Sequence, residues 1–156
     1  MTIECDVVVV GTGLAGVMAA RAAAEAGANV CVISKTQRGA PNCTTRAWGG
    51  ATYSTDETAD ELVAQIVNAA GLLSNQNLVR ALPEDIPARL ADLAAVGVEM
   101  DEPMLTSPEM PGVVRWSYRD KDSGLAVIDL IVAQAEEAGA KFMFGQGTYG
   151  DHTELG

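Results

Sequence analysis

Three glycines near the start of the chain have a spacing that suits the binding of a diphosphate group. Gly11, Gly13 and Gly16 follow the apolar run of residues 6–10 and open a run of small residues. In such a strand-to-helix bend the first glycine permits the tight turn and the second lets the backbone approach the phosphates, while the third lets the helix pack closely on the sheet. The first N–H groups of the helix point at the anion, and the helix dipole favours negative charge there. The sequence therefore predicts a dinucleotide-binding motif.

The next apolar run, residues 29–33, ends in a position that usually recognises the adenosine ribose. In dinucleotide-binding folds an acidic residue there accepts hydrogen bonds from the ribose. Here the position is Ser34, and Lys35 follows it. The residues leave two interpretations open. In one, Lys35 and Arg38 take the 2′-phosphate of NADP; in the other, the chain binds FAD with Ser-Lys in place of Glu-Lys.

The elements that position these residues follow from hydrophobic patterning. We expect strands over 5–10 and 29–33, both nearly all apolar, as in parallel sheets that are buried on both faces. Between them we expect a helix from about Leu14 to Ala26, which Gly27 ends as a C-terminal cap. A helix over about 124–138 and a third strand over 141–144 complete the pattern. The fold class is therefore α/β, with three parallel strands in the order 3-2-1, counted along the chain.

Helices dominate the expected structure of the middle of the chain. Residues 35–55 are predicted to be irregular, and one helix is expected from Thr58 or Asp60 to about Gly71. A second helix, capped by Ser74, is expected to break at Pro83, and a further helix should run from about residue 84 to 97. A proline-rich loop follows at 103–111. This arrangement predicts a half-sheet with helices on one face only, which is an incomplete domain or one that needs a partner.

Charge, length and cysteine content limit the function classes. The net charge of −11 argues against nucleic acid or an anionic membrane as a partner. Residues 1–50 are not acidic, with four basic and three acidic side chains, so an anionic cofactor is compatible with that segment. No apolar run approaches the roughly 20 residues that span a bilayer. Three cysteines without metal or disulfide spacing predict reduced thiols, no metal site and a cytoplasmic location.

Residues 33–50 carry a family resemblance. Ile33-Ser34-Lys35, followed by the segment Cys43-Thr44-Thr45-Arg46-Ala47-Trp48-Gly49-Gly50, resembles the flavoprotein subunits of succinate dehydrogenase and fumarate reductase, and L-aspartate oxidase. Later segments match that family in pattern only, including Leu93–Glu99 and Asp122-Ser123-Gly124. The resemblance implies a Rossmann-like FAD-binding fold. Residues 1–156 would be the N-terminal part of an FAD-binding domain, with a helical insertion at about 56–100 and no capping domain.

The resemblance also assigns roles to individual residues. The pyrophosphate of FAD would lie against residues 11–16, and Ser34 and Lys35 would lie at the adenosine ribose. Thr44, Thr45, Gly49 and Gly50 would follow the ribityl chain and the isoalloxazine ring. The residues predicted to bind the cofactor are Gly11, Thr12, Gly13, Leu14, Ala15, Gly16, Ser34, Lys35, Cys43, Thr44, Thr45, Gly49 and Gly50.

Cys43 departs from the pattern of the membrane-bound members of this family, whose histidine at this position joins FAD covalently. Histidyl attachment is therefore excluded here, and we expect dissociable FAD; a cysteinyl–flavin bond is the alternative. In the resembling enzymes, hydride passes between flavin N5 and a dicarboxylate. The groups that hold the substrate come from later segments, which nothing in these 156 residues matches. We therefore assign no catalytic residue and do not expect this chain alone to be catalytically competent.

The expected function is the FAD-binding portion of a flavin-dependent oxidoreductase, served by an electron-transfer partner subunit. A dicarboxylate substrate would bind only with the capping domain in place. The alternatives are a non-catalytic dinucleotide-binding module and an NADP-binding domain.

Overall fold

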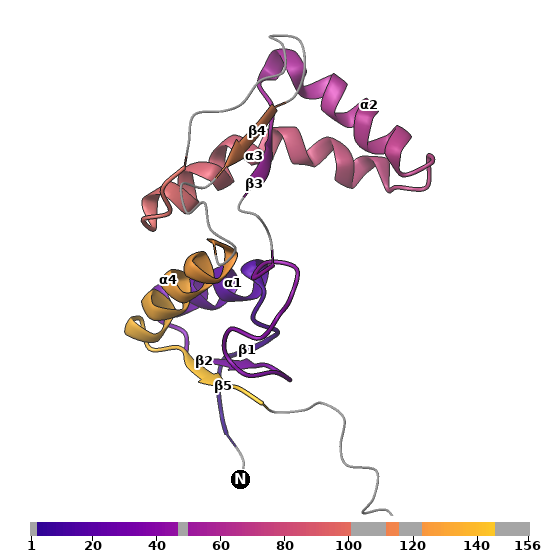
Figure 1. Cartoon of the computed structure of the whole chain (residues 1–156). Helices are drawn as coiled ribbons and strands as arrows, with labels where there is room; N and C mark the ends of the chain where they lie inside the picture. Colours follow the sequence, from indigo (N-terminus) through magenta and orange to yellow (C-terminus); the bar gives the residue numbers. More distant parts are fainter. Residues whose placement is uncertain (1–2, 47–49, 101–111, 116–122, 146–156) are drawn as a thin grey trace, which may run out of the picture. The chain divides into compact units, whose positions relative to one another are not determined.

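The chain divides into two compact units. The computed structural model describes residues 3–46, 50–100, 112–115 and 123–145 (Figure 1). The first unit is made of Met1–Trp48 together with Asp120–Gly156, and the second unit is Gly49–Arg119. The expected helical segment at about 56–100 falls within the second unit.

A three-stranded parallel sheet forms the base of the first unit. Its strands are β1 (Val7–Val10), β2 (Val30–Ile33) and β5 (Lys141–Met143), in the order β1-β2-β5. Val7 lies opposite Val30, and Cys31 lies opposite Lys141. This arrangement confirms the predicted strand order, because the last strand of the chain pairs with the second and the second pairs with the first.

Two helices cover one face of this sheet (Figure 1). They are α1 (Leu14–Glu25) and α4 (Ser123–Glu137), and their bounds differ from the predicted ones by only a residue. Ala20 and Ala24 of α1 are buried against Val30 and Val32 of β2. Because alanine side chains are short, α1 can lie close to the sheet. Gly27 ends α1 with a φ of +87°, which is the predicted left-handed cap.

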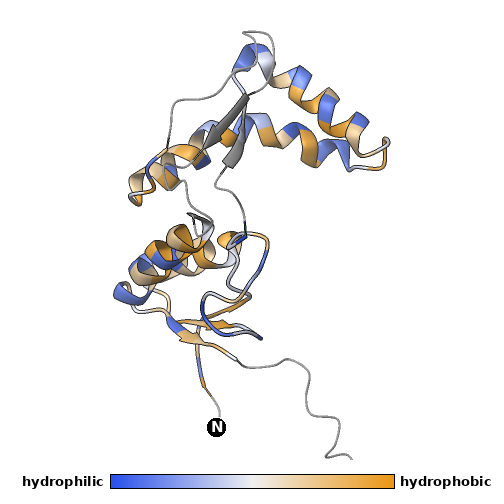
Figure 2. Ribbon diagram, in the orientation of Figure 1, coloured by the Kyte–Doolittle hydropathy of each residue, from blue (hydrophilic) through white to orange (hydrophobic). Residues whose placement is uncertain are grey.

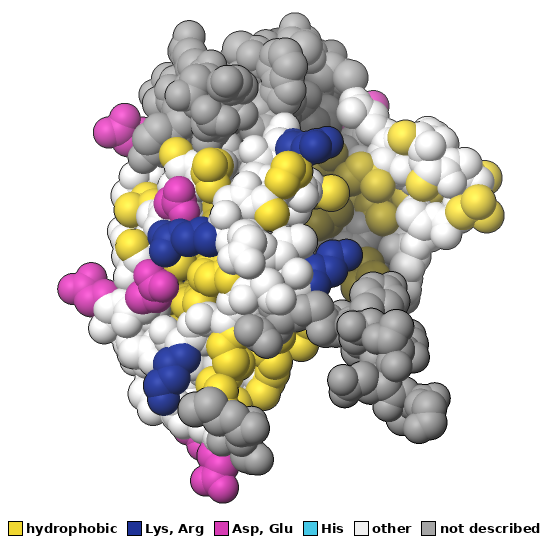
Figure 3. All heavy atoms as spheres, turned by 60° about the horizontal axis from the view of Figure 1, so that its bottom comes forward, with side chains coloured by type: hydrophobic (Ala, Val, Ile, Leu, Met, Phe, Trp, Pro, Cys, Tyr) yellow, Lys and Arg dark blue, Asp and Glu magenta, His cyan; other side chains and the backbone are white. Residues whose placement is uncertain are grey.

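The opposite face of the sheet has no helix on it among the described residues. Val8 and Val10 of β1 are 54% and 73% exposed there, whereas their neighbours Val7 and Val9 pack against the core. Figure 3 turns this lower side of the sheet toward the viewer and shows hydrophobic side chains at the surface. The expectation of a sheet with one open face is confirmed. That a partner or a further segment covers it stays a prediction.

The second unit holds two helices and a two-stranded sheet. A short 3₁₀ turn, η1 (Asp56–Thr58), leads into α2 (Ala59–Ala69), which packs against α3 (Gln76–Ala95). The strands β3 (Gly50–Tyr53) and β4 (Gly112–Arg115) pair antiparallel, with Gly50 opposite Arg115. The expectation that residues 35–55 are irregular throughout is therefore wrong. Each of these strands has only four residues, and the partners lie some sixty positions apart, so local patterning does not show the pairing.

The predicted break at Pro83 is also wrong. Helix α3 continues through Pro83 and Pro87, although proline lacks the N–H that would bond the carbonyl four residues before it. Val79 and Leu93, one on each side of the prolines, are both buried. Packing of these two ends holds one helix where isolated propensity favours two. The cap is Asn75 rather than Ser74, since Asn75 Oδ1 accepts a hydrogen bond from Asn77 N at 3.1 Å.

Hydrophilic and hydrophobic residues alternate along α2, α3 and α4 (Figure 2). This pattern is typical of helices with one face on a protein core and one face toward solvent. None of the helices in the described part of the chain has the length and apolar character that a bilayer crossing requires.

Candidate functional site

The glycine bend between β1 and α1 has the backbone geometry that its spacing predicts. Gly11 has a φ of +105°, a conformation that L side chains rarely adopt, and its N–H donates to Ile33 O at 2.8 Å. Gly13 caps α1 without a side-chain hydrogen bond. A Cβ at Gly16 would overlap the carbonyl group of Gly11, so only glycine lets the first turn of α1 lie against the end of β1. The geometry of the bend therefore requires glycine at positions 11 and 16.

A cavity of about 330 Å³ opens at the carboxyl ends of β1 and β2. In open α/β sheets, ligands bind in the crevice at this end of the strands. Five of the predicted cofactor-binding residues line the cavity: Gly11, Thr12, Gly13, Ser34 and Lys35. The remaining lining residues are Val10, Ile33, Thr36 and Asn42. The structure therefore brings together the glycine bend and the Ser-Lys pair, which lie about twenty residues apart in the sequence.

Hydroxyl groups take the place of a carboxylate at the end of β2. Ser34 is buried, and its Oγ accepts a hydrogen bond from Thr12 Oγ1 at 3.2 Å. The same oxygen lies 3.4 Å from Thr36 Oγ1. We call Thr12, Ser34 and Thr36 the hydroxyl cluster. Lys35 beside it is exposed and forms no ion pair among the described residues, so it brings an uncompensated positive charge to the cavity wall.

The segment after β2, residues 34–46, forms a compact loop that we call the β2 loop. Asn42 organises its second half, because Asn42 Oδ1 accepts hydrogen bonds from Thr44 N at 2.8 Å and from Thr45 N at 3.0 Å. Asn42 N in turn donates to Thr45 Oγ1 at 2.9 Å. Asparagine side chains commonly close turns in this way. These hydrogen bonds give the second half of the loop a defined shape.

Thr44 connects the β2 loop to both helices of the first unit. Its Oγ1 accepts a hydrogen bond from Leu14 N at 3.1 Å, which satisfies one of the free donors at the start of α1. Its carbonyl group lies against Gly124 at the start of α4, where a Cβ would overlap it. The first turns of α1 and α4 thus both contact the β2 loop at Thr44.

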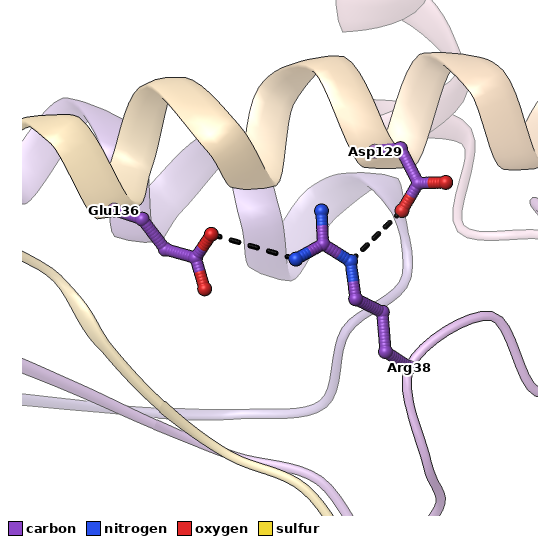
Figure 4. Close-up of polar contacts among 3 residues, drawn as sticks. All are labelled: Arg38, Asp129 and Glu136. Carbon is purple, nitrogen blue, oxygen red and sulfur yellow. Dashed lines mark hydrogen bonds and ion pairs between the residues drawn. The ribbon is translucent and has the colours of Figure 1, made fainter.

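Arg38 turns away from the cavity and toward α4 (Figure 4). Its Nε donates to Asp129 Oδ1 at 2.9 Å, and its Nη1 donates to Glu136 Oε2 at 3.4 Å. The hydrogen bond to Asp129 is the main reason why the pKa of the Arg38 guanidinium lies above its ordinary value. The charge of Arg38 is therefore shared with two carboxylates instead of facing the cavity.

The other predicted site residues that the structure describes do not line the cavity. Leu14, Ala15 and Gly16 form the first turn of α1, and Thr44 and Thr45 lie in the β2 loop, with Thr45 buried. Cys43 is exposed in that loop. Gly50 opens β3 in the second unit. Gly49 and Trp48 lie outside the described residues, so the predicted glycine pair stays a prediction.

Thr36, Asn42 and Gly124 were missed as functional positions in the sequence reasoning. A signal for Asn42 was present, because asparagine after Pro41 and before two threonines is typical of a side-chain-closed turn. Gly124 appeared only as the start of a helix. Nothing local predicts its contact with Thr44, eighty residues earlier in the chain.

The comparisons with known proteins agree with this geometry. The sequence model of the family described as "FAD binding domain" matches residues 6–148. L-aspartate oxidase from Mycobacterium bovis is 32% identical over 139 residues, which are 87% of this chain and 25% of that protein. The chain therefore spans about a quarter of the length of this curated relative.

Two solved structures share the fold. Quinol fumarate reductase FrdA from E. coli has a TM-score of 0.74 at 19% identity, over 93% of this chain and 26% of that one. The 3-ketosteroid-Δ4-(5α)-dehydrogenase from Rhodococcus jostii RHA1 has a TM-score of 0.73 at 22% identity, over 91% of this chain and 38% of that one. At these identities the likeness establishes the fold alone.

Replacement of Gly124 by alanine is expected to destabilise the protein. Alanine normally stabilises a helix relative to glycine, but here its Cβ would collide with the Thr44 carbonyl group. We expect a loss of roughly 1–3 kcal/mol in the free energy of unfolding, as for other overpacked sites. Urea denaturation measures it. Gly13→Ala is the control, because its Cβ would lie 3.7 Å from the nearest atom, Thr44 Oγ1, an ordinary contact. A Gly124→Ala protein more stable than the wild type would contradict this packing.

Proposed function

Because this chain belongs to the FAD binding domain family, we propose that its glycine bend and the cavity beside it hold the adenosine diphosphate part of FAD. The observation that carries the proposal is the cavity at the ends of β1 and β2, whose wall joins Gly11 and Gly13 to Lys35. Glycine there leaves room for close approach of the phosphates, and the lysine ammonium supplies positive charge. At about 330 Å³ the cavity is at the small end of ligand pockets and suits part of a dinucleotide.

The hydroxyl cluster supports the placement of the ribose. Ser34 and Thr36 present hydroxyl oxygens that both donate and accept hydrogen bonds, so they can pair with ribose hydroxyls. In this proposal Thr44 and Thr45, with Gly49 and Gly50, follow the ribityl chain and the flavin ring. When bound, FAD supplies the hydride-accepting centre, and the residues of this chain bind and orient it.

The ion pairs of Arg38 favour FAD over NADP. The NADP interpretation needs both Lys35 and Arg38 at a 2′-phosphate. Arg38 is engaged by Asp129 and Glu136 on α4 and does not line the cavity. Only Lys35 is left to bind the 2′-phosphate of NADP. A lone lysine makes a weak site, because this phosphate is usually recognised by an arginine.

Titration with FAD tests the binding proposal. We expect quenching of flavin fluorescence with the wild type and at least tenfold weaker binding with Gly13→Ala, because a methyl group there would contact the diphosphate at a cost of about 1.4 kcal/mol or more. The urea midpoint of Gly13→Ala should match that of the wild type, which separates binding from folding. Thermal stabilisation by NADPH together with no effect of FAD would refute the assignment.

The proposed FAD is dissociable. Cys43 is exposed in the β2 loop, at the position where the membrane-bound relatives of the resembling family have the histidine that joins the flavin. A cysteine cannot form the histidyl bond, and we propose that it forms no other bond to the flavin. After acid precipitation and washing of the FAD-loaded protein, the pellet should lose its flavin fluorescence. Fluorescence that stays with the wild-type pellet and is lost in Cys43→Ser would demonstrate a cysteinyl bond instead.

For the complete protein we propose an oxidoreductase that transfers hydride between flavin N5 and a dicarboxylate. Support comes from the names of the relatives, since aspartate and fumarate are both dicarboxylates. The fold alone does not support this substrate class, because a ketosteroid dehydrogenase shares it. No residue in the described part of the chain is proposed to be catalytic. A cytoplasmic location and an electron-transfer partner belong to the same proposal.

Anaerobic reduction of the bound flavin tests the substrate class. We expect the complete gene product, loaded with FAD, to lose its yellow absorbance on addition of L-aspartate or succinate. A steroid with an oxidisable ring serves as the control substrate and should leave the flavin oxidised. Bleaching by the steroid alone would contradict the dicarboxylate proposal. A gene product that holds FAD and is reduced by neither would favour the non-catalytic binding module.

A further inference from the structure

Arg38 belongs to the β2 loop but does not line the cavity. Among the described residues it is the one cation of this loop that forms ion pairs. Its neighbours Lys35 and Thr36 line the cavity, and so does Asn42 beyond it. Arg38 itself bonds Asp129 at 2.9 Å and Glu136 at 3.4 Å, which lie 91 and 98 residues away in the chain. The proposed function does not use this arginine as a ligand, so its contacts require another explanation.

Asp129 and Glu136 stand two helical turns apart on the same side of α4, and the guanidinium lies between them (Figure 4). Arginine suits this geometry because its planar group presents several donors in a fixed fork. One cation between two carboxylates remains charged, and the raised pKa of Arg38 agrees with that. We call Arg38, Asp129 and Glu136 the loop tether.

The loop tether lies on the same helix as a second attachment of the loop. At the start of α4, Gly124 contacts the carbonyl group of Thr44, and a Cβ at Gly39 would lie 3.3 Å from Leu125 Cδ1. The β2 loop therefore follows α4 from its first turn to Glu136. Thr44 in turn caps α1 through Leu14 N at 3.1 Å. Because Thr44 belongs to the tethered loop, the loop tether also influences where Thr44 lies at the first N–H groups of α1.

We propose that Arg38 is a positioning residue for the cofactor: by tying the β2 loop to α4 it holds Thr44 and Asn42 in their binding positions before FAD arrives. This inference rests on the proposed function, because it names how the FAD site is kept in shape. A loop that is ordered in advance adds less entropic cost to binding. Arg38 acts through the loop and does not touch the cofactor.

The exposure of the tether makes this role separable from overall stability. The side chains of Arg38, Asp129 and Glu136 are 40%, 45% and 44% exposed. Ion pairs that are this open to water contribute little to the stability of a fold. Loss of the tether should therefore release the loop and leave the packed sheet and helices intact.

The test compares Arg38→Met with Arg89→Met in the full chain. Arg89 pairs with Asp92 at 2.9 Å on α3 in the second unit, so its replacement removes the same charge and a similar exposed pair away from the loop. We expect Arg38→Met to weaken FAD binding about two- to tenfold, the effect of one or two exposed ion pairs. Arg38→Lys should fall between Arg38→Met and the wild type. Arg89→Met should bind FAD like the wild type, and all urea midpoints should agree.

Amide hydrogen exchange without cofactor is the second measurement. The amides of Leu14, Thr44 and Thr45 are bonded within the loop or to it, so they report its opening. Both Arg38→Met and the Asp129→Asn/Glu136→Gln double variant should speed their exchange, and Arg89→Met should not. Unchanged exchange in the first two would overturn the proposal. So would unchanged FAD affinity in Arg38→Met.

The two measurements separate this proposal from the function on which it rests. If the wild-type chain binds no FAD, the proposed function fails, and the exchange rates still decide whether the tether holds the loop. If Arg38→Met weakens FAD binding while the loop exchanges as in the wild type, Arg38 acts on the cofactor directly. That result overturns the positioning role and leaves FAD binding intact.

Discussion

Close backbone contact at two glycines is the constraint on which the first unit depends. Gly16 lets the start of α1 lie against the carbonyl group of Gly11, and Gly124 lets the start of α4 lie against that of Thr44. Any side chain at either position would push a helix away from the carboxyl ends of the strands. The cavity lies beside these contacts, with the glycine bend and residues of the β2 loop in its wall.

The charged side chain that lines the cavity is positive, whereas the net charge of the protein is negative. The chain carries a net charge of −11, and yet Lys35 at the cavity has no carboxylate partner in the described part of the chain. Ser34 stands where dinucleotide-binding folds usually have an acidic residue, and the residues that line the cavity include no carboxylate. Asp129 and Glu136 of α4 form ion pairs with Arg38, which does not line the cavity. Lys35 and Arg38 therefore differ: Lys35 lines the cavity without a carboxylate partner among the described residues, whereas Arg38 is paired with two carboxylates.

The side chains of β1 alternate between a covered face and an exposed face of the sheet. Val7 and Val9 pack under the helices, while Val8 and Val10 on the other face remain exposed. Parallel sheets normally have both faces covered, which is why four consecutive valines are typical of such a strand. The valine run therefore fits a doubly covered sheet better than the single covered face that is described here.

The three parallel strands, their order, the two helices that cover them and the glycine bend could all be predicted from the amino-acid pattern. These features depend on local periodicity and on glycine spacing, which neighbouring residues carry in full. Three features could not be predicted in this way: α3 continues through Pro83, β3 pairs with β4, and Arg38 forms hydrogen bonds with α4 and does not line the cavity. In each case the deciding contact joins segments that are distant in the chain or depends on packing at both ends of a helix. Local propensity contains no information on such contacts, because their energy comes from groups that only the folded chain brings together.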